Sequence, residues 1–67
     1  MKNMKLRLKQ LRGQKGLSQK EMAKILNLST SSIGMYEQGR RLPTYDTLIR
    51  YAQLFDVSLD YLITGKE

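Results

Sequence analysis

A stripe of small, uncharged side chains is the part of this sequence whose residue types and spacing best suit close contact with a polar partner. Its members recur at helical spacing and are Ser31, Gly34, Met35 and Gln38. A solvated helix face normally carries charged residues and a buried face carries large apolar ones, so this stripe fits neither description. Gly34 costs about 1 kcal/mol of helix propensity relative to Ala. It is either a tolerated flaw or a means of bringing the helix close to its partner.

Positive charge is concentrated in the larger, N-terminal part of the 67-residue chain. Residues 1–41 carry ten basic and two acidic side chains, which gives a net charge of +8, whereas residues 42–67 have a net charge of −2. Such asymmetry is typical of a chain that turns one face toward a polyanion. Basic residues also keep small proteins soluble, so the charge alone leaves nucleic-acid binding and plain solubility open.

The segment Leu17–Gln38 must position the stripe, and its residues predict two short helices joined by a tight turn. Ser18 and Glu21 form a capping box, in which each side chain bonds the backbone N–H of the other at the start of a helix. Asn27 tolerates the left-handed conformation that a sharp turn needs, and Ser29 can cap the second helix.

Apolar residues at helical spacing predict three further helices, and the apolar–polar alternation typical of strands never persists. The length is sufficient for one domain only. We therefore expect a single all-α domain over residues 1–67, with five short helices at about 4–14, 19–26, 30–38, 45–55 and 59–64. Its core should contain Leu8, Leu11, Leu17, Met22, Ala23, Leu26, Leu28, Ile33, Tyr36, Leu48, Ala52, Phe55, Val57, Leu59 and Leu62.

The composition argues against several kinds of chemistry. The chain has no Cys and no His, so it lacks disulfides, thiolate metal ligands and the usual general base. Its six acidic residues are scattered and form no obvious catalytic pair. We therefore expect no enzymatic activity, metal site, cofactor or small-molecule ligand. No stretch approaches the roughly 20 apolar residues of a membrane span, and the basic N-terminus lacks the apolar centre of a signal peptide, so a cytoplasmic protein is expected.

A series of positions from about Leu8 to Gly65 carries a family pattern. The positions are Arg12, Gly16–Ala23, Leu28, Ser29, Ile33, Tyr36, Glu37, Gly39, Pro43, Leu48 and Val57–Gly65. In this order and spacing they resemble the helix-turn-helix repressors of the Cro and phage-repressor (XRE) type. The resemblance implies a lambda-repressor-like DNA-binding domain in a bacterial or phage-encoded, nucleoid-associated protein. The chain departs from the family at Asn27, where Gly is usual, and at Gly34 and Met35, where many relatives carry polar base-reading side chains.

The resemblance also implies that residues 30–38 lie in the major groove of double-stranded DNA while residues 19–26 cross its backbone. Base reading then falls to Thr30, Ser31, Gly34, Met35 and Gln38. Phosphate contacts fall to Gln19, Lys20, Ser29, Ser32, Arg40 and Arg41. Because few of these side chains can make a bidentate contact with a base, affinity should depend on phosphate contacts and DNA shape more than on direct base bonds.

Two further groups have structural roles in the resemblance. Arg12 and Glu37 match positions that relatives use for a buried ion pair between the first helix and the recognition helix. The alternative is an exposed pair worth about 0–1 kcal/mol. A C-terminal group that relatives often use to form homodimers comprises Leu59, Tyr61 and Leu62. The alternative there is that Tyr61 only covers the edge of the core.

These features predict a sequence-specific DNA-binding transcriptional regulator. The expected type is a phage- or mobile-element-type repressor that binds a palindromic operator as a dimer. The same fold also activates transcription, so the direction of regulation stays open. The alternative is a protein-interaction module, or an antitoxin-type partner, that keeps the fold and binds DNA weakly or not at all. A salt titration separates the two, because affinity for DNA falls steeply with salt.

Overall fold

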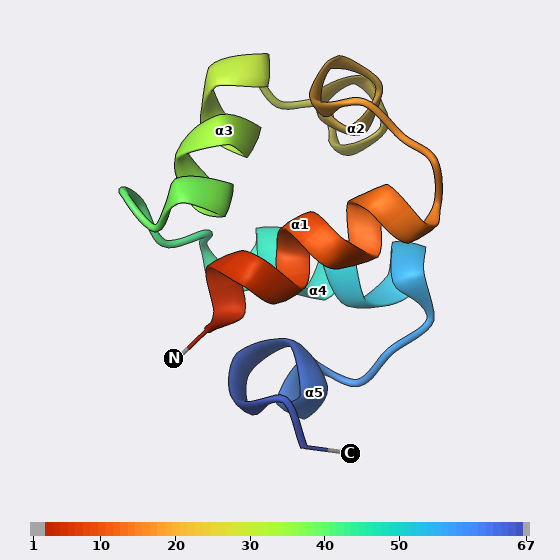
Figure 1. Ribbon diagram of the computed structural model, residues 1–67, viewed down its shortest axis with the longest axis vertical. Helices are drawn as coiled ribbons and strands as arrows, with labels where there is room; N and C mark the ends of the chain where they lie inside the picture. Colours follow the sequence, from red (N-terminus) through yellow and green to blue (C-terminus); the bar gives the residue numbers. More distant parts are fainter. Residues whose placement is uncertain (1–2, 67) are drawn as a thin grey trace.

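The computed structural model describes residues 3–66, which form five α-helices. They are α1 (Met4–Gln14), α2 (Gln19–Leu26), α3 (Thr30–Gln38), α4 (Tyr45–Phe55) and α5 (Leu59–Thr64). In Figure 1, α1 crosses the middle of the molecule in front of α4, with α2 and α3 at one end and α5 at the other. The expected all-α fold of five short helices is thereby confirmed.

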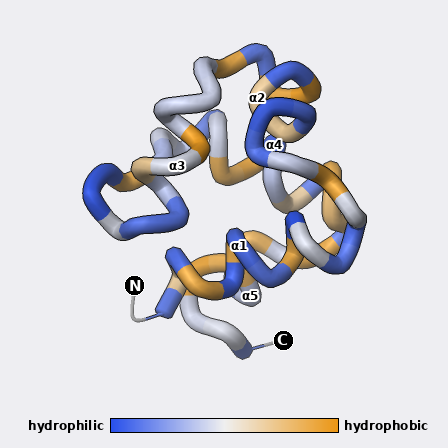
Figure 2. The backbone as a smooth tube through the Cα atoms, turned by 45° about the horizontal axis from the view of Figure 1, so that its top comes forward, coloured by the Kyte–Doolittle hydropathy of each residue, from blue (hydrophilic) through white to orange (hydrophobic). Residues whose placement is uncertain are grey.

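One apolar core joins the five helices. Helix α1 contacts both α3 and α5, and α2 contacts α3 and α4. Hydrophobic and hydrophilic residues alternate along α1 in Figure 2, as expected for a helix with one side on the core. The buried apolar residues are Met4, Leu8, Leu11, Met22, Ala23, Leu26, Ile33, Tyr36, Leu48, Tyr51, Phe55 and Leu62.

The core differs from the expected one at its margins. Five expected members are only partly buried, namely Leu17, Leu28, Ala52, Val57 and Leu59. Three of them, Leu17, Leu28 and Val57, immediately precede the cap residues of α2, α3 and α5. Residues at that position pack on the first turn of the following helix. These three residues therefore cover the core from the connecting turns and do not fill its centre.

Tyr51 on α4 is a core residue that the sequence analysis left out. It has no exposed surface, and its ring meets that of Tyr36 edge-on, with the centroids 6.5 Å apart. Its hydroxyl has no hydrogen-bond partner within residues 3–66. Burial raises the pKa of Tyr51 well above its ordinary value, and the negative charge of Glu37 adds to the effect. The Tyr51 hydroxyl therefore stays neutral inside the core.

Arg7 fastens α5 to α1. Its Nε donates to the carbonyl oxygen of Leu62 at 3.1 Å, and its Nη2 donates to that of Ile63 at 3.2 Å. Gly65 ends α5 in the left-handed region, with φ of 79°, and a Cβ at this position would lie 2.7 Å from Arg7 Nη1. Glycine is therefore favoured here by the backbone conformation, and a Cβ would also displace the Arg7 guanidinium.

Candidate nucleic-acid interface

Local capping interactions set the ends of α2 and α3. Ser18 Oγ accepts a hydrogen bond from the Glu21 backbone N–H at 3.0 Å, and Glu21 Oε1 accepts one from the Ser18 N–H at 2.8 Å. Asn27 ends α2 in the left-handed region, with φ of 57°. Ser29 Oγ then accepts from the Ser32 N–H at 3.1 Å and starts α3. The two helices are therefore joined by residues 27–29 only.

The outer face of α3 forms an open hollow of about 510 Å³. Side chains from α2 and from the loop after α3 join this hollow at Gln19 and Arg40. The remaining lining residues are the five expected to read bases, Thr30, Ser31, Gly34, Met35 and Gln38. Most of α3 is pale in Figure 2, which means that this helix is neither strongly hydrophobic nor strongly hydrophilic. The five residues thus share one uncharged surface.

A buried ion pair holds α3 against α1. Arg12 Nε donates to Glu37 Oε2 at 2.6 Å, and Arg12 Nη2 donates to Glu37 Oε1 at 2.9 Å. Only 15% of the Arg12 side chain and 3% of the Glu37 side chain are exposed. The hydrogen bond with Glu37 raises the pKa of Arg12. Arg12 Nη1 also donates to the carbonyl oxygen of Leu17 at 2.7 Å, so the same guanidinium fixes the chain just before α2.

Gln19, at the start of α2, is bonded to this ion pair. Its Nε2 donates to Glu37 Oε1 at 3.2 Å, and its amide lies against Gly34, where a Cβ would be 3.7 Å from Gln19 Oε1. The expected contact of Gln19 with phosphate would use the amide N–H groups, because a phosphate oxygen can only accept. One of the two amide N–H groups donates to the Glu37 carboxylate, and the other remains available to a phosphate or a base.

The other expected phosphate contacts are polar groups around α3, where Ser29 is exposed and Ser32 is partly exposed. The hydroxyls of Ser29 and Ser32 lie 2.9 Å apart and share one hydrogen bond. One of the two hydroxyl hydrogens is used in that bond, so the other remains available to an anion. Lys20, Arg40 and Arg41 are also exposed. The structure therefore leaves each of these groups accessible, on α2, in the turn before α3, on α3 or in the loop that follows α3.

A third cation lies beside that loop. Gly39 ends α3 with φ of 73°, and a Cβ on it would be 2.7 Å from Lys5 Cδ and 3.6 Å from Lys5 Nζ. Lys5, from the first turn of α1, therefore lies over the end of α3. Arg40 and Arg41 follow Gly39 directly in the loop after α3. Lys5 was not predicted from the sequence. Lys5 and Arg12 are seven residues apart and therefore lie on the same side of α1. Because Arg12 pairs with Glu37 of α3, this spacing could have indicated that Lys5 also faces α3.

Comparison with known protein families matches this architecture. Residues 8–62 match the family model described as helix-turn-helix. The chain belongs to the XRE-type helix-turn-helix family. Helices α2 and α3 are therefore its helix-turn-helix unit.

Three relatives in Bacillus subtilis (strain 168) are named helix-turn-helix transcriptional regulators. The uncharacterized regulator YqaE is 46% identical over 59 residues, which cover 88% of this chain and 51% of YqaE. The regulator ImmR is 43% identical over 61 residues, which cover 91% of this chain and 47% of ImmR. The SPbeta prophage-derived uncharacterized regulator YonR is 39% identical over 59 residues, which cover 88% of this chain and 55% of YonR. This helix-turn-helix chain thus spans about half the length of these relatives.

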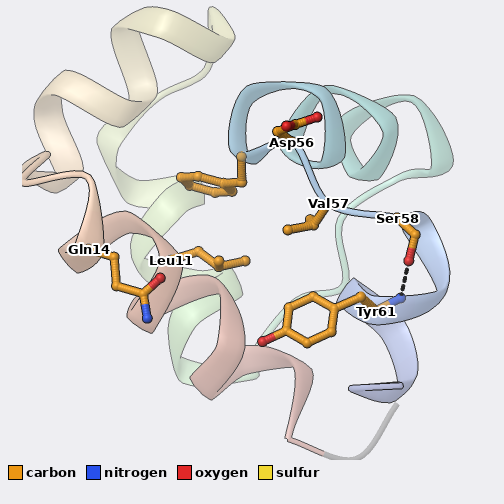
Figure 3. Close-up of a pocket in the computed structure, with 7 residues that line it drawn as sticks. Leu11, Gln14, Asp56, Val57, Ser58 and Tyr61 are labelled. Carbon is orange, nitrogen blue, oxygen red and sulfur yellow. Dashed lines mark hydrogen bonds between the residues drawn. The ribbon is translucent and has the colours of Figure 1, made fainter. Parts of the chain in front are cut away.

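The candidate dimer residues lie on α5, away from the helix-turn-helix unit. Leu62 has no exposed surface, so its expected place in a dimer interface is wrong, because the side chain is used in the monomer core. Leu59 and Tyr61 are partly exposed. Figure 3 shows the Tyr61 ring and the side chains of Leu11 and Val57 pointing toward one another across an open groove of about 630 Å³. Tyr61 is the expected dimer residue that lines this groove.

Two further properties of residues 3–66 bear on the site. No group of three or more His, Cys, Asp or Glu side chains there is arranged so that it could hold a metal ion. None of the described helices combines the length and the apolar character needed to cross a membrane.

Proposed function

We propose that this helix-turn-helix chain is a sequence-specific DNA-binding transcriptional regulator. The observation that carries the proposal is the hollow on α3, where five uncharged residues form one surface beside Arg40. Lys5 and Arg41 extend the positive rim at the end of α3. A neutral, hydrogen-bonding surface beside exposed cations has the chemistry needed to meet base edges while phosphates are held alongside. The names of the relatives as transcriptional regulators support this function.

In the proposed complex, α3 enters the major groove and α2 crosses the DNA backbone. Thr30 and Met35 offer methyl groups for thymine, while Ser31 and Gln38 offer hydrogen-bonding groups for base edges, directly or through water. Phosphate contacts come from Ser29, Ser32 and Lys20 and from the cations at the end of α3. Sequence preference then arises from a few base contacts and from DNA shape.

The proposal extends to a homodimer that binds an approximately palindromic operator and represses an overlapping promoter by excluding polymerase. Two-fold symmetry would set the two α3 helices about 34 Å apart, one turn of DNA. A phage- or mobile-element context is supported by the prophage-derived relative. A regulator of this kind works in the cytoplasm, at the chromosome.

The test is selection of bound fragments from a random pool of double-stranded DNA, followed by measurement of affinity against salt. The selected fragments should share a motif with two-fold symmetry. If 6–10 phosphates are contacted, affinity for that motif should fall about 10³–10⁵-fold between 50 and 200 mM salt. Simultaneous Arg40→Ala and Arg41→Ala substitution should weaken binding to all sequences and reduce the slope of log affinity against log salt by about 2.

Lys66→Ala is the matched control, because it removes an exposed cation beyond the end of α5. This variant should keep both the affinity and the salt slope of the wild-type chain. A pool in which no fragment is enriched, or an affinity that does not respond to salt, would favour a protein-interaction module over a DNA-binding regulator.

A further inference from the structure

Two glutamine amides converge on the one position of α3 that has no side chain. A Cβ on Gly34 would lie 3.7 Å from Gln19 Oε1 and 3.9 Å from Gln19 Nε2. It would also lie 4.0 Å from Gln38 Nε2. The Gln19 amide therefore takes the space that a side chain at position 34 would fill. This places a residue of α2 within the uncharged surface of α3.

The orientation of the Gln19 amide is fixed by the buried ion pair. A carboxylate only accepts hydrogen bonds, so Glu37 must face the amide nitrogen, which it does at 3.2 Å from Nε2. Glu37 is itself fixed by two hydrogen bonds from Arg12. One N–H of the amide is used in this way, and the other N–H and the carbonyl oxygen have no partner within residues 3–66. The amide thus presents one donor and one acceptor.

We propose that Gln19 reads an adenine in the major groove through the space that Gly34 leaves, with Arg12 and Glu37 as positioning residues. This inference rests on the proposed function, since it assigns a specificity-determining residue to the same site. Adenine presents an N7 acceptor and an N6 donor in the major groove, which match the free N–H and carbonyl oxygen of a glutamine amide. A phosphate only accepts, so it could use the free N–H but would leave the acceptor Oε1 without a donor.

The decisive experiment replaces adenine by 7-deazaadenine, one position at a time, in the DNA fragment selected by the wild-type chain. This analogue removes the N7 acceptor and keeps the rest of the base. At one adenine of each half-site, the wild-type chain should lose affinity by a factor on the order of ten. Gln19→Ala should bind the natural and the substituted DNA equally well at that position. The wild-type measurement does not depend on whether any variant folds.

Variants at two neighbouring positions separate this role from a structural one. In a repeated selection, Gln19→Ala should lose its preference for adenine at the mapped position, a discrimination of about 5- to 150-fold, and keep the wild-type salt slope. Gly34→Ala should retain the preference, because its Cβ would be in ordinary contact with the Gln19 amide. Gly34→Met should lose it, because a long side chain displaces that amide. Thr30→Ala is the matched control and should change the preference at a different position.

Two results would overturn the inference and leave the proposed function intact. One is a Gln19→Ala variant that binds all sequences more weakly and keeps the wild-type preference for adenine, since a uniform loss across sequences is the behaviour of a phosphate contact. The other is a Gly34→Met variant with an unchanged preference for adenine. Failure of the proposed function looks different, because the wild-type chain would then select no DNA at all.

Discussion

Glu37 is the residue at which three helices meet. Helix α1 contributes Arg12, α2 contributes Gln19, and α3 carries the carboxylate that accepts hydrogen bonds from both. Only 3% of the Glu37 side chain is exposed, so these hydrogen bonds replace the water that would otherwise solvate the charge. A buried charge that loses its partner is left with an uncompensated desolvation cost. The ion pair therefore fixes the direction of α3 relative to α1.

Arg12→Ala or Glu37→Ala alone should lower the free energy of unfolding by about 3–5 kcal/mol, because each leaves the opposite charge largely buried without a counter-charge. Urea denaturation followed by circular dichroism measures the change. The combined Arg12→Met and Glu37→Leu variant is the control, since it removes both charges and keeps apolar volume, and it should be more stable than either single variant. A loss below about 1 kcal/mol in each single variant would mean that the pair behaves as an exposed one.

Residue-level roles were predictable only where sequence spacing or family resemblance points to a partner. The resemblance pointed to Arg12 and Glu37. The bond from Gln19 to Glu37 could not be predicted, because it joins residues of different helices and depends on their distance in the fold. The sequence also could not show which of the three expected dimer residues on α5 are buried in the monomer. A six-residue helix has too few turns to reveal its buried side. Leu62 proved to face the core.

At the scale of the elements, the helix ends follow from local side-chain chemistry. The side chains of Ser18, Ser29, Thr44 and Ser58 each accept a hydrogen bond from the backbone N–H three residues later. Left-handed residues end the same four helices at Asn27, Gly39, Asp56 and Gly65. These signals are local in the sequence, which is why a five-helix fold could be predicted. The packing of Tyr51 could not be predicted in this way, because it depends on contacts between helices.

The capping box of α2 should make stability depend on pH. The hydrogen bond from the Ser18 backbone N–H lowers the pKa of Glu21 below its ordinary value of 4.5. Its contribution to stability is therefore present above about pH 4.5 and is lost as the pH falls through the lower pKa of the folded state. The difference in free energy of unfolding between the wild-type chain and Glu21→Gln should be largest near neutral pH and shrink below about pH 4.5. Urea denaturation at a series of pH values measures it.

Ser18→Ala is the control for this titration. It removes the hydroxyl that caps the Glu21 N–H, at a cost of about 0.5–2 kcal/mol, but keeps the backbone N–H that bonds the Glu21 carboxylate. Much of the pH-dependent part of the free energy of unfolding that Glu21 contributes should remain in Ser18→Ala and should be absent in Glu21→Gln. A difference between the wild-type chain and Glu21→Gln that stays constant from neutral to acidic pH would show that the carboxylate does not act as a charged cap.

At the scale of the whole molecule, α1 separates two surfaces of different character. Helices α2 and α3 lie at one end, and α5 lies at the other end (Figure 1). Residues 1–41, which include α1, α2 and α3, have a net charge of +8, and residues 42–67, which include α4 and α5, have a net charge of −2. The sequence predicts this difference in charge, because charge is a property of the chain. It does not predict which surfaces of two copies fit together, because that depends on their shape.

We expect self-association through the groove beside α5, and Tyr61→Ala should weaken it. The groove is lined by Tyr61 together with apolar side chains of α1 and of the turn before α5, and burying these groups against a second copy would be favourable. Sedimentation equilibrium over a range of concentrations should show a monomer–dimer equilibrium that shifts toward the monomer by about tenfold or more, as expected for an aromatic residue at the centre of an interface.

Tyr45→Ala is the matched control, because it removes another tyrosine that is 67% exposed, at the start of α4. This variant should associate as the wild-type chain does, and circular dichroism should show that both variants remain folded. A dimer that responds to Tyr45→Ala and not to Tyr61→Ala would move the interface to the α3–α4 side of the molecule.

The close approach of Lys5 to Gly39 makes the two ends of the chain unequal as attachment points for a tag. The first turn of α1 lies over the end of α3, so a fluorescent protein or affinity handle joined there would begin beside the cationic loop and crowd the duplex. Lys66 follows α5, across α1 from α3 (Figure 1). A group attached after α5 by a flexible linker would leave the proposed nucleic-acid surface open.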